Sequence, residues 1–217
     1  MSRQKRDSEA TKVKIVQNAM LLFSQKGFDA TTVDDIAKKS EINKAMIYYY
    51  YKNKATLYET IMAQLFNEIY NAIVKADKTC KNPLCSLKMF IQTYTHYCEK
   101  HPYLPTLMLR ELSNGGQNLP NMMFSGMREL FALLSKILKE GENEGYFKNT
   151  IPMVVHFMIT GTINLLFVTQ NLREKAKTLD EELNTCSTCS MNELSEYVYE
   201  KIKLMLEVKD EKNLTDI

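Results

Sequence analysis

The stretch of residues 31–57, TTVDDIAKKSEINKAMIYYYYKNKATL, constrains the fold of this chain most strongly. It contains two short helical patterns separated by a polar turn. In the first pattern, Val33 and Ile36 recur at helical spacing, and Thr32 with Asp35 has the form of a capping box, in which each residue bonds the backbone of the other. We therefore expect a short helix to begin directly after Thr32.

The second pattern follows after a turn of three residues, 40–42, and Asn43 is a suitable cap for its first turn. Ile47 and Tyr51 lie four residues apart, so they share one face of this helix. Two short helices joined by a turn of about three or four residues form a helix-turn-helix, whose second helix enters the major groove of DNA. The stretch therefore predicts a DNA-reading element.

The opposite side of the second helix has a composition suited to that role. If Ile47 and Tyr51 face the core, the exposed side carries Lys44, Ala45, Tyr48 and Tyr49. Lysine pairs with phosphates or guanine acceptors, and tyrosine offers a hydroxyl group to phosphate and a ring to thymine methyl groups. The alternative is that the four consecutive tyrosines only pack under a longer helix, which explains Tyr51 but not the exposed side around Lys44.

The order G-F-x-x-T-T-V-x-x-I-A, followed by I-N-K-A-M-I-Y-Y-Y-Y-x-N-K-x-x-L, resembles the N-terminal domain of the TetR/AcrR family of transcriptional regulators over about residues 12–60. The resemblance implies that Thr32 and Lys54 hold the DNA backbone, and that Lys44 and Tyr48 to Tyr50 contact bases or phosphates. The full set of expected DNA-binding residues is Thr32, Asn43, Lys44, Ala45, Tyr48, Tyr49, Tyr50 and Lys54.

Three positions depart from the family pattern. Glu41 stands in the turn where the family usually has glycine, Ala45 stands where glycine is frequent, and Tyr50 replaces a frequent histidine. Glu41 must adopt a left-handed conformation at some cost or shift the turn, because only glycine enters that region freely.

The composition restricts the fold class and the cellular location that we expect for the whole chain. Its 217 residues are 45% hydrophobic, and they include only seven glycines and five prolines with no alternating apolar runs of note, which predicts an all-α protein. No apolar run is long enough to span a bilayer, and the first residues lack the apolar segment of a signal peptide, so we expect a cytoplasmic protein that does not bind membranes. Because five cysteines cannot form a complete disulfide framework, we expect reduced thiols.

The net charge of +2 is distributed unevenly. Residues 1–57 carry 11 Lys and Arg against 6 Asp and Glu, a net charge of +5, and the remaining residues carry 17 against 20, a net charge of −3. A basic N-terminal part (the head, residues 1–57) on a mildly acidic remainder (the body, residues 58–217) fits a nucleic-acid contact confined to the N-terminal part. The alternative is ordinary variation of surface charge, which gives similar numbers.

We expect two domains and about nine helices: a three-helix DNA-binding domain at residues 1–57 and a helical ligand-sensing and dimerisation domain at residues 58–217. Residues 1–10 are expected to form a mobile arm, the first helix spans about residues 11–25, and Gly27 is its C-terminal cap. A helix over residues 54–76 is a plausible rigid rod from head to body. Further helices are expected over residues 84–99, 103–112, 120–144, 152–172 and 191–208, with a loop or weak helix over residues 173–190.

The body is rich in methionine and aromatic residues, since ten of the thirteen methionines lie beyond residue 57. Methionine suits a cavity that accepts bulky apolar guests, although each such residue is more often ordinary core. The expected ligand-pocket residues are Phe66, Tyr70, Phe90, Tyr94, Met108, Met123, Met127, Phe131 and Phe157.

The last two long helices are expected to form a dimer, because an apolar helix such as 152–172 would otherwise expose a large apolar patch. In the family, these helices pack against their mates as a four-helix bundle. The expected interface residues are Met158, Thr162, Leu165, Leu166, Val198, Ile202 and Met205. A two-fold dimer sets its recognition helices about 34 Å or a small multiple apart, which predicts a near-palindromic operator.

The sequence therefore predicts a homodimeric regulator, by family expectation a repressor, whose partners are double-stranded operator DNA and a small, largely apolar effector that releases it. The main alternative is a redox- or metal-sensing regulator of the same fold that uses Cys186 and Cys189, a lone CxxC. A small helical thiol enzyme is a weaker alternative. We expect no cofactor, no metal site and no catalytic residues, because the sequence contains no clear nucleophile–base set and no phosphate-binding glycine loop.

Overall fold

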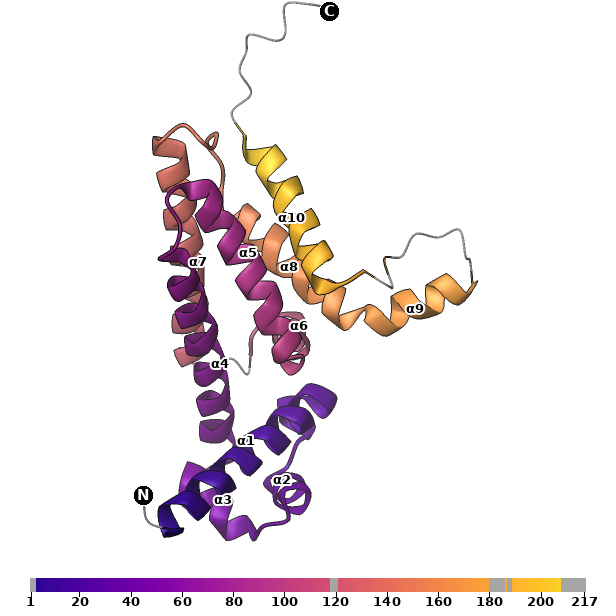
Figure 1. Cartoon of the computed structure of the whole chain (residues 1–217). Coiled ribbons are helices and arrows are strands. Elements are labelled where there is room, and N and C mark those ends of the chain that lie inside the picture. The colour runs from indigo at the N-terminus through magenta and orange to yellow at the C-terminus, as the bar shows by residue number, and fades with distance from the viewer. Residues whose placement is uncertain (1–2, 118–120, 180–185, 187–188, 208–217) are drawn as a thin grey trace, which may run out of the picture. The chain divides into compact units, whose positions relative to one another are not determined.

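The computed structural model describes residues 3–117, 121–179, 186 and 189–207, with side chains described at residues 8–117, 124–179, 186 and 189–207. These residues form ten α-helices and no strand beyond one antiparallel bridge between Phe147 and Glu207, which confirms the all-α prediction (Figure 1). The helices are α1 (Arg3–Ala30), α2 (Val33–Ser40), α3 (Lys44–Tyr51), α4 (Lys54–Asp77), α5 (Pro83–Lys100), α6 (Tyr103–Ser113), α7 (Asn121–Asn143), α8 (Pro152–Val168), α9 (Gln170–Leu179) and α10 (Met191–Leu206).

The chain divides into two compact units. The N-terminal unit comprises Met1–Glu68 and His101–Met127, and the C-terminal unit comprises Ile69–Lys100 and Arg128–Ile217, so α4 and α7 contribute to both. The predicted domain boundary after residue 57 divides the chain by function, and it stays a prediction. In packing, α6 joins the N-terminal unit.

The N-terminal unit is built on an aromatic centre. The ring centroids of Phe23 and Tyr58 are 4.8 Å apart, and Phe28 lies 5.0 Å from Tyr58. The Tyr58 hydroxyl donates a buried hydrogen bond of 2.7 Å to Oε1 of Glu111 on α6. This bond satisfies the Tyr58 hydroxyl, which would be costly to bury without a partner. Helices α1, α2 and α3 pack in succession around this core, and α6 packs on α1.

Helix α1 is longer than the pattern of apolar residues predicted. It begins at Arg3 instead of about residue 11, so the arm expected over residues 1–10 is helical from its third residue onward. Residues 3–10 are mostly good helix formers and contain neither glycine nor proline, so nothing stops the helix there. The predicted break at Gly27 is confirmed, because its φ of 85° interrupts the helix.

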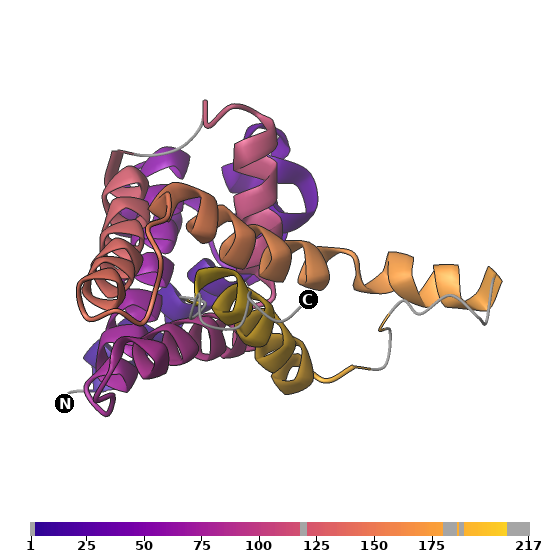
Figure 2. The ribbon, with the colours of Figure 1, turned by 90° about the horizontal axis from the view of Figure 1, so that it is seen from above.

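The C-terminal unit is built on three helices, α5, α8 and α10, which pack on one another (Figure 2). The Tyr94 hydroxyl of α5 donates to Oδ1 of Asn164 on α8 (3.0 Å), and Lys88 and Gln92 of α5 donate to Glu196 of α10 (2.6 and 3.0 Å). At the other end of α10, the backbone N–H of Lys148 donates to the carbonyl of Leu206 (2.8 Å).

The region after residue 168 differs from the predicted pattern. Helix α8 ends at Val168 instead of near residue 172, and Gln170 begins a separate helix, α9, across a bend of 64°. Helix α9 buries none of its residues and projects from α5, α8 and α10 in both ribbon views (Figures 1 and 2). Its apolar residues Leu172, Ala176 and Leu179 share one face, but they stand in a strongly charged segment and none of them is buried, so the sequence left a loop and a weak helix both open.

The expectation of reduced thiols is wrong for four of the five cysteines. Cys80 is bonded to Cys85 at the start of α5, and Cys186 is bonded to Cys189 just before α10, while Cys98 is a buried free thiol. The odd number of cysteines excluded complete pairing but not two short local pairs.

None of the described helices is on its own both long enough and apolar enough to cross a membrane, and α8 and α9 meet that criterion only as a bent pair.

Candidate nucleic-acid interface

The first helix of the predicted helix-turn-helix is fixed by the predicted capping box. The Thr32 Oγ1 accepts a bond from the Asp35 N–H (3.0 Å), and the Asp35 carboxylate accepts one from the Thr32 N–H (3.1 Å). These bonds from Thr32 lower the pKa of Asp35, with a smaller contribution from Lys26. The Thr32 hydroxyl is exposed and keeps its hydrogen for an outside acceptor such as a phosphate oxygen.

The turn between the helices has the predicted strained residue. Glu41 has φ 52° and ψ 43°, the left-handed conformation, and its backbone N–H satisfies the last carbonyls of α2. Its carboxylate accepts a hydrogen bond of 2.7 Å from Lys14 of α1, which lowers the pKa of Glu41. The turn therefore keeps the family geometry with glutamate in place of glycine.

The second helix, α3, presents its expected sides. Ile47 and Tyr51 are buried, and the Asn43 side chain caps the helix by accepting from the Ala45 N–H (2.9 Å). On the opposite side, Tyr49 is 79% exposed and Tyr48 is 44% exposed, with Ala45 beside them in the open. The surface formed by Ala45, Tyr48 and Tyr49, which we call the α3 outer face, can therefore reach a groove without rearrangement.

Lys44 reaches the edge of the α3 outer face but is already paired. Its ammonium donates to Oδ2 of Asp34 on α2 (2.7 Å), and this bond raises its pKa, so the side chain stays protonated. Both partners are largely exposed, and exposed ion pairs are weak. A phosphate can therefore take the ammonium from Asp34, and no spacing rule in the sequence would have shown this pairing.

Two predicted contact residues are engaged inside the N-terminal unit. The Tyr50 hydroxyl lies 3.1 Å from Ser8 Oγ, and its ring lies 5.6 Å from Lys12 Nζ, so Tyr50 packs toward α1. Lys54 donates to the carbonyl of Phe28 (2.7 Å) and lies 4.2 Å from the centroid of its ring. These contacts fasten α3 and α4 to α1, and the DNA-binding roles expected of Tyr50 and Lys54 stay predictions.

The contact of α6 with α1 could not be predicted from the sequence. Arg110 donates from Nε to the Ser24 carbonyl (3.0 Å) and from Nη2 to the Gln25 carbonyl (2.8 Å), just before the break at Gly27. Basic residues often satisfy the free carbonyls at the end of their own helix, but here Arg110 and Gln25 are 85 residues apart in the chain. Local pattern reading cannot find such a pair.

The predicted pocket residues are divided between the units, and the prediction that they line one pocket stays a prediction. Phe66, Met108 and Met127 lie in the N-terminal unit, whereas Tyr70, Phe90, Tyr94 and Phe131 lie in the C-terminal unit. Phe66, Phe90, Tyr94 and Met108 are buried. The side chain of Met123 lies outside the described residues. Phe157 is 56% exposed on α8, so it faces solvent and does not belong to the interior of the protomer.

The predicted interface residues separate into two groups. Met158, Thr162 and Leu165 are exposed, and Leu166 and Met205 are half-buried. Val198 and Ile202 are only 7% and 6% exposed on α10, so they pack inside the protomer, which corrects their assignment to the dimer surface. An apolar face on a helix marks burial, but it does not show whether the covering element belongs to the same chain.

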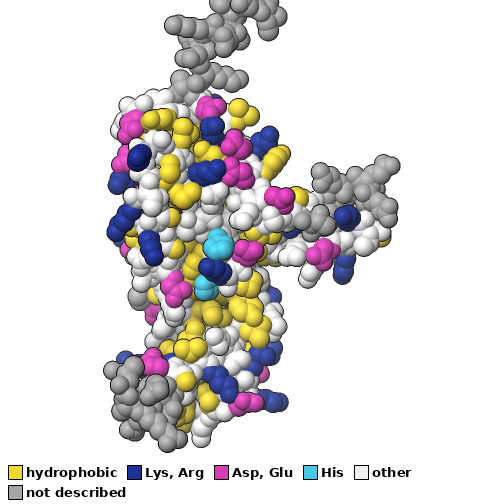
Figure 3. Space-filling view, viewed as in Figure 1, with side chains coloured by type: hydrophobic (Ala, Val, Ile, Leu, Met, Phe, Trp, Pro, Cys, Tyr) yellow, Lys and Arg dark blue, Asp and Glu magenta, His cyan; other side chains and the backbone are white. Residues whose placement is uncertain are grey.

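On the face drawn in Figure 3, Lys and Arg side chains lie scattered among hydrophobic and acidic ones. Among the described residues, no group of three or more His, Cys, Asp and Glu side chains could hold a metal ion.

The geometry agrees with comparisons to known proteins. The family model described as bacterial regulatory proteins, tetR family, matches residues 15–61, and the model described as YsiA-like protein, C-terminal region, matches residues 58–185. The chain is 32% identical over 139 residues to IcaR of Staphylococcus aureus, the negative transcriptional regulator of the biofilm operon icaADBC, and this match covers 64% of the chain and 73% of IcaR. It is 28% identical over 155 residues to the probable regulator YttP of Bacillus subtilis, covering 69% of the chain and 72% of YttP.

A solved structure shows the same fold. A bacterial regulatory protein in the TetR family from Rhodococcus RHA1 aligns with a TM-score of 0.73 at 17% identity, over 97% of this chain and 100% of that one. The capped helix-turn-helix with its α3 outer face, the all-helical body and these matches lead to one conclusion: the chain belongs to the TetR family of DNA-binding transcriptional regulators.

Proposed function

We propose that this regulator represses transcription as a homodimer bound to a near-palindromic operator, and that a small, largely apolar ligand releases it. The relative from Staphylococcus aureus is described as a negative regulator, which supports repression here. Regulation by DNA binding, instead of catalysis, is what family membership establishes.

The observation that carries the proposal is an exposed apolar stripe on α8. Seven large apolar side chains on this helix or directly before it are 42–66% exposed: Ile151, Met153, Val154, Phe157, Met158, Leu165 and Val168. From Val154 onward, their positions at 154, 157, 158, 165 and 168 place them on one side of the helix, opposite the buried Val155, Ile159 and Ile163.

We expect this stripe to be buried against another protein surface, because monomeric proteins rarely expose contiguous apolar patches of this kind. Gly161 lies in the middle of the stripe, and a Cβ atom added there would meet nothing within 4 Å in the protomer. A glycine with open space on its outer side allows a second helix to approach closely. The same stripe of a second copy is a suitable cover, because a two-fold interface is self-complementary.

Dimerisation would provide the DNA specificity. A single α3 outer face contacts only a few base pairs, whereas two copies related by a two-fold axis read two half-sites of one duplex. The operator is then a near-palindrome, and loss of the dimer weakens specific binding.

The route from effector to DNA runs through α4 and α6. Helix α4 starts directly after α3 and continues from the N-terminal unit into the C-terminal unit. The Tyr58–Glu111 bond joins α4 to α6, and the Arg110 bonds join α6 to the end of α1. A ligand that displaces α4 or α6 would therefore move the base of the helix-turn-helix, and by linkage DNA would weaken ligand binding equally.

The C-terminal unit also indicates the chemistry of the ligand. The His156 ring lies 5.8 Å from Phe131, and burial lowers the pKa of His156, so it is neutral. His156 Nδ1 and Ser135 Oγ are both buried with no hydrogen-bond partner among the described residues. Unpartnered buried polar atoms are costly, and a mostly apolar ligand with one polar group would satisfy them.

A charge placed in the α8 stripe tests the central part of the proposal. In Phe157→Asp, dimer formation would bury an unpaired carboxylate, so we expect dimer affinity to fall at least about 100-fold, since such a charge costs about 3–5 kcal/mol. Sedimentation velocity measures the dimer, and fluorescence anisotropy on operator DNA measures binding.

The matched control is Leu112→Asp, which places the same charge on a leucine of α6 that is 48% exposed and lies outside the stripe. The control should remain dimeric. A monomeric wild type, or a Phe157→Asp variant that dimerises and binds the operator normally, would rule out the α8 interface.

A further inference from the structure

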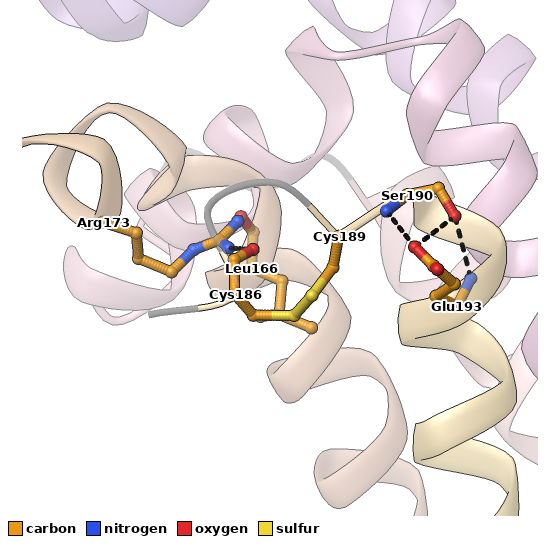
Figure 4. Close-up of a disulfide and its surroundings, with 6 residues drawn as sticks. All are labelled: Leu166, Arg173, Cys186, Cys189, Ser190 and Glu193. Carbon is orange, nitrogen blue, oxygen red and sulfur yellow. Dashed lines mark hydrogen bonds between the residues drawn. A yellow bond between two sulfur atoms is a disulfide. The ribbon is translucent and has the colours of Figure 1, made fainter. Parts of the chain in front are cut away.

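The Cys186–Cys189 disulfide lies just before α10 (Figure 4). Both cysteines are half-buried, so their sulfurs are not sealed in the core. The pair has no role in the DNA-binding surface or in the proposed α8 stripe. The pair directly precedes α10, a helix in the core of the C-terminal unit.

Cys186 is tied to two neighbouring helices through Arg173. The Cys186 carbonyl accepts a hydrogen bond of 2.7 Å from Arg173 Nη1 on α9 and one of 3.4 Å from the Cys189 N–H. Arg173 Nη2 donates to the carbonyl of Leu166 in the last turn of α8 (2.8 Å), as Figure 4 shows. One guanidinium group therefore connects the end of α8 with Cys186.

The backbone of Cys186 has an unfavourable conformation. Its φ of 49° lies in the left-handed region, which non-glycine residues rarely occupy. The closed disulfide and the two bonds to its carbonyl hold it there. Once the disulfide opens, the residue is free to return to an ordinary conformation and leave Arg173.

The start of α10 follows directly. Ser190 and Glu193 form a capping box, in which Ser190 N donates to the Glu193 carboxylate (2.7 Å) and Glu193 N donates to Ser190 Oγ (3.2 Å). Leu194 and Ser195 in the same turn are buried, and α10 packs on α5 and α8. A change at Cys189, directly before the Ser190 cap, is therefore transmitted to the helix that supports α8.

We infer that the Cys186–Cys189 pair is a reversible thiol–disulfide switch that sets the order of the α10 N-terminus and, through α8, the affinity of the regulator for its operator. The effect on the operator rests on the proposed function. The oxidised form is the ordered, tightly binding one.

The chemistry needs a dithiol as reductant. One thiolate of the dithiol attacks a sulfur of the pair, the Sγ–Sγ bond breaks and a mixed disulfide forms. The second thiol of the dithiol then displaces the protein thiol, so the pair gains two electrons and two protons, and the dithiol becomes a disulfide. A low-molecular-weight disulfide reverses the exchange. Cys98 takes no part, because it is buried and burial raises the pKa of its thiol to about 12.

The test compares the full-length protein before and after reduction by dithiothreitol, with the thiol count checked by alkylation and mass spectrometry. Hydrogen exchange at residues 189–195 should rise on reduction, and operator affinity should fall by about fivefold or more, the lower end of typical couplings between sites. Cys186→Ser/Cys189→Ser should behave as the reduced protein in both measurements and should not respond to dithiothreitol.

The chain offers a matched control in its other disulfide. Cys80→Ser/Cys85→Ser removes the pair at the start of α5 and should keep the full response. Unchanged exchange at α10 after complete reduction would overturn the inference, as would a response that disappears with the Cys80–Cys85 pair. If neither form binds any operator, the proposed function fails, and exchange at α10 still decides the switch.

Discussion

At the scale of single residues, the tyrosine run of α3 divides its members among three roles. Tyr51 is in the core, Tyr50 packs toward α1, and Tyr49 is the most exposed, with Tyr48 beside it. Helical geometry alone assigns Tyr51 and Tyr49 correctly, because they lie on opposite sides of the axis. The role of Tyr50 depends on Ser8 and Lys12, whose helix reaches back further than its apolar pattern indicated.

Tyr49 is therefore the residue whose loss should affect DNA binding most selectively. We expect Tyr49→Ala to lower operator affinity about 10- to 100-fold, the range for losing one or two good base-edge or phosphate contacts. Its stability should change by less than about 0.5 kcal/mol, because an exposed side chain is removed. Fluorescence anisotropy and urea denaturation measure the two quantities.

The control for this prediction is Tyr146→Ala, which removes a tyrosine that is 37% exposed in the connection between α7 and α8. Its operator affinity should equal that of the wild type. Equal losses in the two variants would show that Tyr49 acts through general stability and not through contact with DNA.

His156 makes stability depend on pH. Burial lowers its pKa below the ordinary value of 6.5, so the unfolded chain takes up the proton first as the pH falls. The contribution of neutral His156 is therefore complete above about pH 6.5 and is lost as the pH falls toward the lowered pKa of the folded state. Urea midpoints at pH 8 and pH 5 should differ more for the wild type than for His156→Leu.

His96→Gln is the matched control, since His96 is an exposed histidine of the same unit. It should keep the pH dependence of the wild type. A His156→Leu variant with an unchanged difference between pH 8 and pH 5 would contradict the assignment.

At the scale of helices, caps and breaks were predictable, whereas contacts between distant helices were not. The Thr32–Asp35 capping box, the Asn43 cap and the Gly27 break all follow from residues within four positions of one another. The Arg110 bonds to α1, the Lys54 bond to Phe28 and the separate helix α9 depend on tertiary packing or on weak local preference. Sequence periodicity carries no information on the two contacts between distant helices, and for α9 it offers only a short apolar spacing within a charged segment.

Two glycines of the C-terminal unit give opposite predictions for the same substitution. In Gly141→Ala, the new Cβ would overlap the ring of Phe147, which is only 2% exposed and part of the bridge to Glu207. Overpacking of this kind costs about 1–3 kcal/mol, which should appear as a lower urea midpoint.

Gly161→Ala has open space in the protomer, so helix propensity favours it by about 1 kcal/mol in the monomer. If a partner helix approaches closely at this point, the added methyl group should weaken the dimer in sedimentation experiments. A destabilised monomer in Gly161→Ala, or a tolerated Gly141→Ala, would contradict the packing described here.

At the scale of the whole molecule, the sequence allowed the all-α fold and the DNA-reading element to be predicted, because both depend on local patterns. The distribution of apolar faces between the interior and a partner could not be predicted. The buried Val198 and the exposed Leu165 are both apolar residues on apolar helix faces, and only the fold separates them. The two disulfides likewise depend on turns that bring neighbouring cysteines together.

The central claim is that the α3 outer face, duplicated by a two-fold partner, reads a specific operator. Selection of bound duplexes from a random DNA pool tests this most directly, with the wild type and Tyr49→Ala run in parallel. We predict that the wild type enriches one near-palindromic sequence whose half-sites are centred about one helical turn or a small multiple apart, and that Tyr49→Ala enriches it weakly or not at all. Enrichment of no sequence by the wild type, or of the same sequence equally by both proteins, would contradict the claim.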